Sequence, residues 1–183
     1  MKRIFIAVNL LEDLKKELAE IKRRLSSEFP SGSLRWVTEE NLHITLVYIG
    51  NIKTERVSEL SSLLDKVKFK KFEASIGELQ YVPDRRSARL IWIDLEGPFE
   101  KLRNRIISSL EKSFSISDTV EFEPHITLAR TKSAFKRIDI EEIPLLDDFW
   151  VDFTFPVESF DLMESRPGRG VPDYKKIKRI NLT

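Results

Sequence analysis

The tetrapeptide His43-Ile44-Thr45-Leu46 is repeated as His125-Ile126-Thr127-Leu128, a little under half the chain length further on. The two copies contain both histidines of the 183-residue chain. From this composition, the chance that the second histidine is followed by the same three residues is roughly one in two thousand. Each copy lies in a segment that favours a strand, so alternation places histidine and threonine on one face. We therefore expect two strands of a duplicated fold to line one cleft with two imidazoles and two hydroxyls.

The rest of the chain predicts a mixed α+β fold with antiparallel strands. Strands are expected over residues 2–9, 34–37, 42–49, 69–82, 89–95 and 120–130, and residues 150–163 are rich in strand-forming types. Apolar residues spaced by three and four predict helices over residues 11–28, 57–67 and 98–110. The strands and helices do not alternate regularly, which disfavours a parallel α/β sheet.

Turns and loops complete this pattern. Pro83-Asp84 separates two predicted strands and indicates a hairpin, and Gly50-Asn51 is expected to end the strand of the first motif. Residues 166–172 are expected to form a loop. Residues 174–181 are ambiguous, because Tyr174, Ile177 and Ile180 are three positions apart but the segment is rich in lysine and too short to predict as a helix.

Composition excludes several classes of function. The chain contains no cysteine, so disulfides, iron–sulfur clusters, thiolate zinc sites and a cysteine nucleophile are impossible. With only two histidines and no H-E-x-x-H spacing, a metal site is disfavoured, and no cofactor is expected. Phosphate-binding P-loop, G-x-S-x-G and Rossmann glycine patterns are absent as well.

Charge and hydropathy limit the location and the partners. Lys and Arg total 31 and Asp and Glu total 30, so the net charge is +1 and any contact with nucleic acid must be local. No stretch is long and apolar enough to span a membrane, and the first residues lack the pattern of a signal peptide. We therefore expect a cytoplasmic protein with no membrane contact.

The two motifs and their surroundings resemble the 2H phosphoesterases, and within them the RNA 2′,3′-cyclic phosphodiesterases, also called 2′-5′ RNA ligases. The similar segments are FIAVNL (5–10), NLHITLVYIG (41–50), FEPHITLAR (122–130) and LMES (162–165). The resemblance implies a bilobal α+β fold, in which two pseudo-symmetric lobes, each with an antiparallel sheet and flanking helices, surround a central cleft. Residues 1–183 would then form a single domain of two lobes. The implied partner is RNA with a 2′,3′-cyclic phosphate end, tRNA-like fragments among them, and we expect a monomer.

The chemistry of cyclic phosphate opening explains the residue types. In-line attack needs a base for the nucleophile and an acid for the departing ribose oxygen, on opposite sides of phosphorus. Histidine, with an unperturbed pKa of about 6.5, can serve as either near neutral pH. The hydroxyls of Thr45 and Thr127 are expected to donate to the non-bridging oxygens, where charge accumulates. Because the ring is already strained, no metal is required.

The resemblance also implies which histidine does what. His43 would donate a proton to the leaving 3′-oxygen and His125 would act as the base on water, which leaves a 2′-phosphate end. Run in reverse, with an RNA 5′-hydroxyl as the nucleophile, the same site would make a 2′-5′ linkage without ATP.

Further candidates lie near the motifs. Arg130 is a candidate phosphate contact because a guanidinium matches phosphate geometry, although strand parity places it on the face opposite His125. Other candidates are less specific, because solvated surface charge and core packing are the ordinary roles of such residues. They are three basic residues that would guide an RNA strand and three aromatic residues that would stack a base: Arg166, Arg169 and Lys175, and Tyr48, Trp36 and Phe122.

Two other functions fit the same four motif residues. One is a cyclic phosphodiesterase that acts on a small nucleotide. The other is a module that binds RNA ends without turnover. Comparing an oligoribonucleotide with a mononucleotide separates the first from an RNA enzyme, and the absence of product despite tight binding would identify the second.

Overall fold

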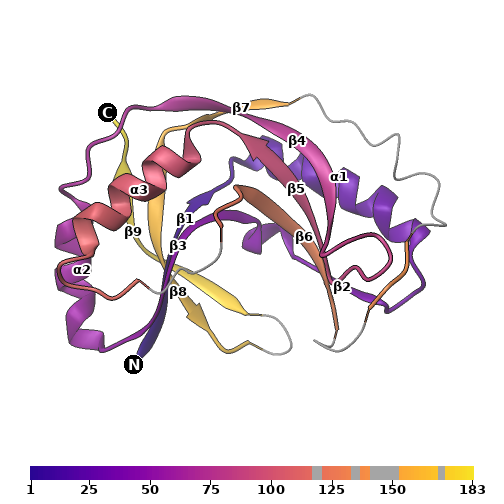
Figure 1. Ribbon diagram of the computed structural model, residues 1–183, viewed down its shortest axis with the longest axis horizontal. Helices are drawn as coiled ribbons and strands as arrows, with labels where there is room; N and C mark the ends of the chain where they lie inside the picture. Colours follow the sequence, from indigo (N-terminus) through magenta and orange to yellow (C-terminus); the bar gives the residue numbers. More distant parts are fainter. Residues whose placement is uncertain (117–120, 133–136, 141–152, 169–171) are drawn as a thin grey trace.

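The computed structural model describes residues 1–116, 121–132, 137–140, 153–168 and 172–183, and it has the predicted α+β architecture (Figure 1). Its helices and strands, in chain order, are β1 (Lys2–Asn9), α1 (Glu12–Glu28), β2 (Leu34–Trp36), β3 (His43–Ile52), α2 (Val57–Leu64), β4 (Phe72–Val82), β5 (Leu90–Glu96), α3 (Phe99–Leu110), β6 (His125–Thr131), β7 (Thr154–Val157), β8 (Ser159–Arg166) and β9 (Asp173–Asn181). Short 3-10 turns at Glu39–Asn41 and Thr54–Arg56 precede β3 and α2. Among the described helices, none is long and apolar enough to cross a membrane.

All strands belong to one curled antiparallel sheet with the order β7-β4-β5-β6-β3-β1-β8-β9, and β2 pairs with β6 (Figure 1). The two halves of this sheet meet where Ile44 of β3 pairs with Ile126 of β6. These are the same position of the two repeated tetrapeptides. Each half contains a strand, a helix and then a motif strand, β1-α1-β3 in one and β5-α3-β6 in the other. The structure therefore confirms the prediction of two pseudo-symmetric halves.

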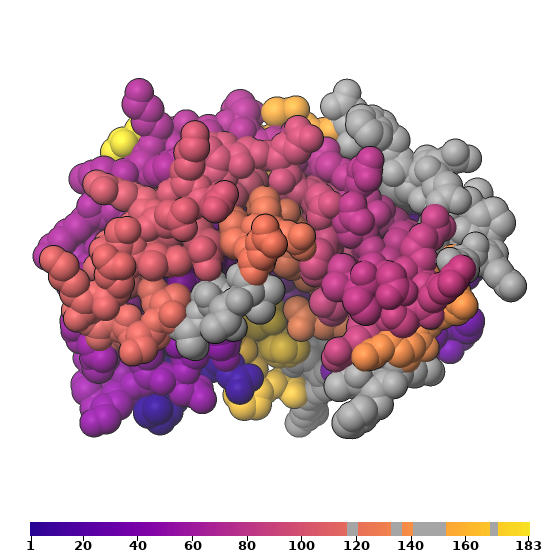
Figure 2. All heavy atoms as spheres, in the orientation of Figure 1, coloured from indigo at the N-terminus to yellow at the C-terminus, as the bar shows by residue number. Residues whose placement is uncertain are grey.

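The helices cross between the halves. The apolar stripe of α1 (Leu14, Leu18, Ile21 and Leu25) is buried, as its spacing predicts. Lys22 of α1 donates through Nζ to the carbonyl of Val37, at 2.6 Å, and so ties the helix to the β2–β6 side. In the same way, α3 follows β5 of one half and contacts α2 and β3 of the other half. In the space-filling view α2 and α3 form one side of the visible face and the β4–β5 hairpin forms the other (Figure 2).

Bulges change the faces of β3, β6 and β9. The leucine of each motif is at one of them: Leu46 has no register partner on β1, and Leu128 has none on β5. A bulge inserts one extra residue into one of two paired strands. Side chains after the bulge therefore point to the face opposite to the one that regular alternation predicts. The bulge of β9 lies at Ile177, between the pairs Leu162↔Lys178 and Met163↔Lys176.

The bulge at Ile177 explains why residues 174–181 fit no simple period. The segment is β9, at the edge of the sheet and paired with β8. Tyr174, Ile177 and Ile180 are three apart, which is unlike a regular strand, because the extra residue shifts the alternation in the middle.

Other predicted strand boundaries differ by a few residues. Gly50-Asn51 does not end β3: the strand continues to Ile52, with Gly50 at a φ of 85° and Asn51 paired with Arg3. A glycine accepts this left-handed conformation at a second irregularity in the register, beside Ile49. The strand expected over residues 120–130 begins at His125, directly after Pro124, whose nitrogen has no proton for the ladder. Residues 120 and 150–152 lie outside the described part of the chain.

Candidate active site

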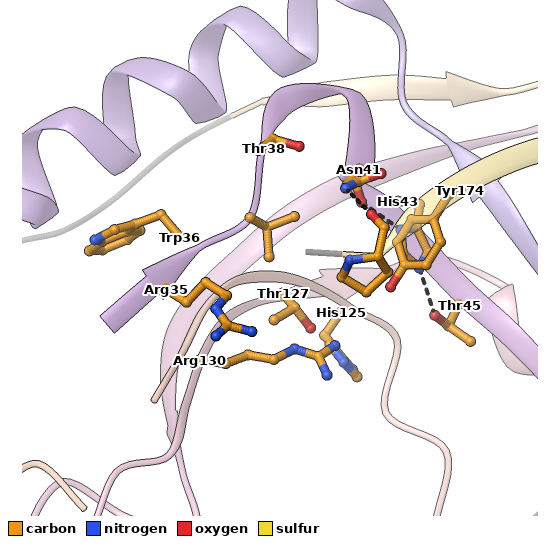
Figure 3. A pocket seen from close by; sticks show the side chains of 12 residues that line it. Arg35, Trp36, Thr38, Asn41, His43, Thr45, His125, Thr127, Arg130 and Tyr174 are labelled. Atoms are coloured by element: carbon orange, nitrogen blue, oxygen red, sulfur yellow. Dashed lines mark hydrogen bonds between the residues drawn. The ribbon is translucent and has the colours of Figure 1, made fainter. Parts of the chain in front are cut away.

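Both repeated motifs open onto one pocket at the junction of the two half-sheets (Figure 3). It is lined by Arg35, Trp36, Val37, Thr38, Asn41, His43, Thr45, His125, Thr127, Arg130, Pro172 and Tyr174. The four motif residues share this face because the pair Ile44↔Ile126, both fully buried, points to the core. The structure thus brings together all five residues that the sequence singled out for catalysis and phosphate binding.

Arg130 reaches the pocket because of the bulge at Leu128. Regular alternation would place Arg130 on the core side, and the prediction from parity was wrong for this residue. Leu128 and Ala129 are both buried as consecutive residues, and the next residue, Arg130, returns to the face of His125 and Thr127. The equivalent residue of the first repeat, five positions after His43, is Tyr48. Only the second repeat therefore contributes an arginine at this position.

His43 lies in an apolar part of the pocket. Its Nδ1 donates to the carbonyl of Asn41 at 2.7 Å, which leaves Nε2 unprotonated in the neutral ring, and Thr45 donates to that Nε2 from Oγ1 at 3.1 Å. Phe5 and Tyr174 pack against the ring, with centroid distances of 5.2 and 5.1 Å. Burial lowers the pKa of His43 to about 4, and the hydrogen bond to Asn41 opposes that shift only in part.

His125 has the same backbone bond but different neighbours. Its Nδ1 donates to the carbonyl of Glu123 at 2.7 Å. The ring stacks on Trp92 with a centroid distance of 4.1 Å and an interplanar angle of 21°, and Trp92 Nε1 donates to Asp94 Oδ1 at 2.8 Å. Burial lowers the pKa of His125, while the bond to Glu123 and the negative charge of Asp94 both act to raise it.

Several known proteins are similar to this chain. A family profile described as LigT-like phosphoesterase matches residues 8–92. An RNA 2′,3′-cyclic phosphodiesterase of Thermotoga maritima is 31% identical over 138 residues, which cover 71% of this chain and 70% of the relative. One from Archaeoglobus fulgidus is 30% identical, over 71% of this chain and 73% of the relative. The chain belongs to the LigT-like family of 2H phosphoesterases.

Solved structures agree with this assignment. E. coli LigT in complex with 3′-AMP superposes on this phosphoesterase with a TM-score of 0.78 at 25% identity, over 100% of this chain and 98% of that one. The protein TT0787 of Thermus thermophilus shares the fold, with a TM-score of 0.82 at 24% identity over 98% and 97% of the two chains. The α+β fold class and the family resemblance predicted from the sequence are therefore confirmed.

The sequence did not point to several residues in or next to this LigT-like pocket; Trp92 and Asp94 do not line it but lie beside His125. Trp92 and Asp94 lie two apart on a predicted strand, so a shared face could have been inferred, but their position beside His125 depends on the pairing of β5 with β6. Arg35 and Tyr174 enter the site from β2 and β9, whose partners the sequence does not reveal. Asn41 closes one side by donating from Nδ2 to the carbonyl of Pro172 at 2.9 Å.

The aromatic candidates have different positions. Trp36 lines the pocket of this phosphoesterase and also packs edge-on against Phe29, at 6.1 Å. Tyr48 is 49% exposed and is not part of the pocket lining. Phe122 also lies away from the pocket lining, under the guanidinium of Arg103 at 5.0 Å.

Two of the three basic candidates, Arg166 and Lys175, do not line the pocket. Arg166 forms an ion pair with Glu164 at 3.0 Å in a neighbouring groove, and Lys175 is exposed on β9. Arg169 lies outside the described residues. Within the ranges that the structure describes, no group of three or more His, Cys, Asp or Glu side chains is arranged to hold a metal ion.

Proposed function

We propose that this protein hydrolyses RNA ends that carry a 2′,3′-cyclic phosphate and leaves a 2′-phosphate. The observation that carries the proposal is the pair of histidines in one pocket, each with Nδ1 held by a carbonyl two residues upstream. This arrangement leaves both Nε2 atoms for proton transfer. The relatives named RNA 2′,3′-cyclic phosphodiesterase support the choice of substrate.

The proposed reaction is an in-line displacement. Water forms a bond to phosphorus and gives a proton to the Nε2 of one histidine, while the bond from phosphorus to the 3′-oxygen breaks. The second histidine gives its Nε2 proton to that oxygen, which leaves a 3′-hydroxyl and a 2′-phosphate. Thr45 and Thr127 donate to the non-bridging oxygens, and Arg130 balances their charge. Binding of the phosphate replaces the bond that Thr45 makes to His43 in the free site.

The two histidines are not equivalent as donors. The family resemblance implies that His43 protonates the 3′-oxygen and that His125 is the base. Because burial lowers the pKa of His43 to about 4, this assignment requires the bound phosphate anion to raise that pKa, as an opposite charge nearby does. The reverse assignment needs no such shift at His43, since a neutral ring is already a base. A substrate with a good leaving group separates the two assignments because it needs no donor.

The finer parts of the proposal concern direction and requirements. We propose that the same site joins a cyclic phosphate end to a 5′-hydroxyl as a 2′-5′ linkage, without ATP, and that neither direction needs a metal. tRNA-like fragments, a monomeric state and a cytoplasmic location stay predictions from the sequence.

The decisive experiment offers the protein an oligoribonucleotide with a 2′,3′-cyclic phosphate end in the presence of EDTA. We expect a 2′-phosphate product, identified by proton-coupled ³¹P NMR, and product formation roughly 10²–10⁴-fold slower with the His43→Ala variant. A 3′-phosphate product would overturn the proposed regiochemistry. Binding of the cyclic end with no turnover would favour an RNA-end-binding module, and loss of activity with EDTA would contradict metal independence.

A further inference from the structure

Two arginines face each other in the active-site pocket. Arg35 of β2 and Arg130 of β6 are direct partners in the antiparallel register, and both line the pocket. Figure 3 shows both arginine side chains at the same side of the pocket, with Arg130 extending toward His125. Like charges at directly opposed positions destabilise a strand pair. This placement therefore needs an explanation other than the stability of the sheet.

Among the residues that the structure describes, no acidic side chain neutralises either arginine. Within the described residues, neither guanidinium has a carboxylate or another acceptor within bonding distance, in contrast to Arg166 and Arg179, which are paired with Glu164 and Asp161. A cyclic phosphate carries one negative charge, and Arg130, next to the motif, is placed to balance it. Arg35 is then left for a second anion.

A second cavity continues from Arg35. This strand groove, as we call it, is lined by Met1, Lys2, Arg3, Arg35, Asn51, Glu164, Ser165, Arg166, Pro167, Gly168 and Pro172. It shares Arg35 and Pro172 with the active-site pocket, so the two cavities adjoin at these residues.

The strand groove is basic. Glu164 is its one acidic lining residue among those that the structure describes, and a single oxygen of that carboxylate binds both Lys2, at 3.1 Å, and Arg166, at 3.0 Å. The guanidinium of Arg3 has no acidic partner in the described ranges and is exposed in the same groove. A line of positive charge thus leads from Arg130 through Arg35 to Arg3.

We propose that Arg35 binds the phosphodiester on the 5′ side of the terminal nucleotide and that the strand groove holds the RNA that precedes it. The inference rests on the proposed function, because it takes the cyclic phosphate to lie at the histidines. The phosphodiester on the 5′ side is the phosphate next to the cyclic phosphate along the strand. With the cyclic phosphate at Arg130, the neighbouring Arg35 would bind this second phosphate. The site then favours an RNA strand over a mononucleotide.

The test compares two substrates that differ by one internal phosphodiester. They are a mononucleoside 2′,3′-cyclic phosphate and a dinucleotide with the same cyclic end. For the Arg35→Gln variant, we expect the ratio of kcat/KM for the dinucleotide to that for the mononucleotide to fall roughly 5–30-fold, the loss of one charge-assisted contact. The loss should appear as a raised KM for the dinucleotide, and this KM should depend less on salt concentration in the variant than in the wild type.

A neutral linkage provides an independent measurement. With a methylphosphonate in place of the internal phosphodiester, the wild-type protein should lose the same factor, and Arg35→Gln should cause no further loss. Arg105→Gln on α3 is the matched control, since Arg105 is an exposed arginine that lines neither cavity. The ratio should stay at the wild-type value in this control.

The outcomes separate the inference from the function on which it rests. An unchanged ratio in Arg35→Gln, with both substrates hydrolysed by the wild type, overturns the role of Arg35 and leaves the proposed function intact. Equal losses on the two substrates overturn it as well, because Arg35 would then act on the reacting phosphate or on folding. Hydrolysis of neither substrate by the wild type overturns both.

Discussion

The two repeated tetrapeptides are identical in sequence and differ in their surroundings. Each histidine donates from Nδ1 to the carbonyl two residues before it, so the motif and its local strand geometry set the same tautomer in both copies. The neighbours come from other strands. His43 packs against Phe5 and Tyr174, which also contact each other, whereas His125 stacks on Trp92. Identical motifs therefore give two rings with different proton affinities.

The pseudo-symmetry of the sheet locates this difference. Asn9 of β1 pairs with His43, and Asp94 of β5 pairs with His125, at equivalent positions of the two halves. The side chain beside His43 is thus a neutral amide, whereas the one at the equivalent position beside His125 is a carboxylate. Burial lowers the pKa of both rings and the charge of Arg130 lowers both further, but the charge of Asp94 acts to raise the pKa of His125, whereas the charges that act on His43, from Arg130 and His125, only lower its pKa. In the free protein, protonation is consequently easier at His125.

The largest expected effect comes from removing either ring. His43→Ala and His125→Ala should each reduce kcat by roughly 10²–10⁴, the contribution of one proton transfer. The measurement is single-turnover hydrolysis of an RNA cyclic phosphate end, with circular dichroism as the control for folding. Near-wild-type turnover in either variant would contradict the two-histidine mechanism.

A leaving-group series then separates the roles of the two rings. A substrate whose 3′-side leaving group is stable as an anion needs no proton donor, so it should restore much of the lost activity only in the variant that lacks the acid. Rescue of His43→Ala supports the roles implied by the family, and rescue of His125→Ala supports the reverse. Rescue of both variants or of neither would mean that the two histidines do not act as one acid and one base.

The threonines should have the next largest effect. Thr45→Val and Thr127→Val keep the shape of the side chain and remove the donor, and each should lower kcat by roughly 10²–10³ if the hydroxyl stabilises the transition state. Steady-state kinetics distinguish this role from simple binding. A raised KM with an unchanged kcat would show that the threonines bind only the ground-state phosphate.

The smallest effect should follow from making the two halves alike. Asp94→Asn removes the negative charge beside His125, so the pKa of this ring should fall further below its usual value, because the imidazolium loses its partner. Histidine NMR titration of the free protein measures this directly, and His43 should stay neutral down to about pH 4 in both proteins.

The matched control for this variant is Asp65→Asn, an exposed carboxylate paired with Lys178 elsewhere on the surface. It should leave the titration of both histidines unchanged. If Asp94→Asn raised the pKa of His125 or left it unchanged, the proposed origin of the asymmetry would be wrong.

Local patterns in the sequence were sufficient to predict the outline of the fold and the centre of the site. Apolar spacing identified α1 and α3, because a helix that packs on a sheet must bury one stripe. In each copy of the tetrapeptide, alternation placed the histidine and the threonine on one face of the strand, because no bulge precedes the leucine. The pairing of Ile44 with Ile126 then brings these two faces together.

Other features of the site depend on strand register and on residues distant in the sequence, so local patterns could not predict them. The bulge at Leu128 turned Arg130 into the pocket, and no local pattern in the sequence marks that insertion, since it forms where β6 meets the register of β5. The residues that distinguish the two rings, Asp94 and Tyr174, come from β5 and β9. Their proximity follows from strand order, which is settled by burial and pairing over the whole sheet rather than by the residues next to each histidine.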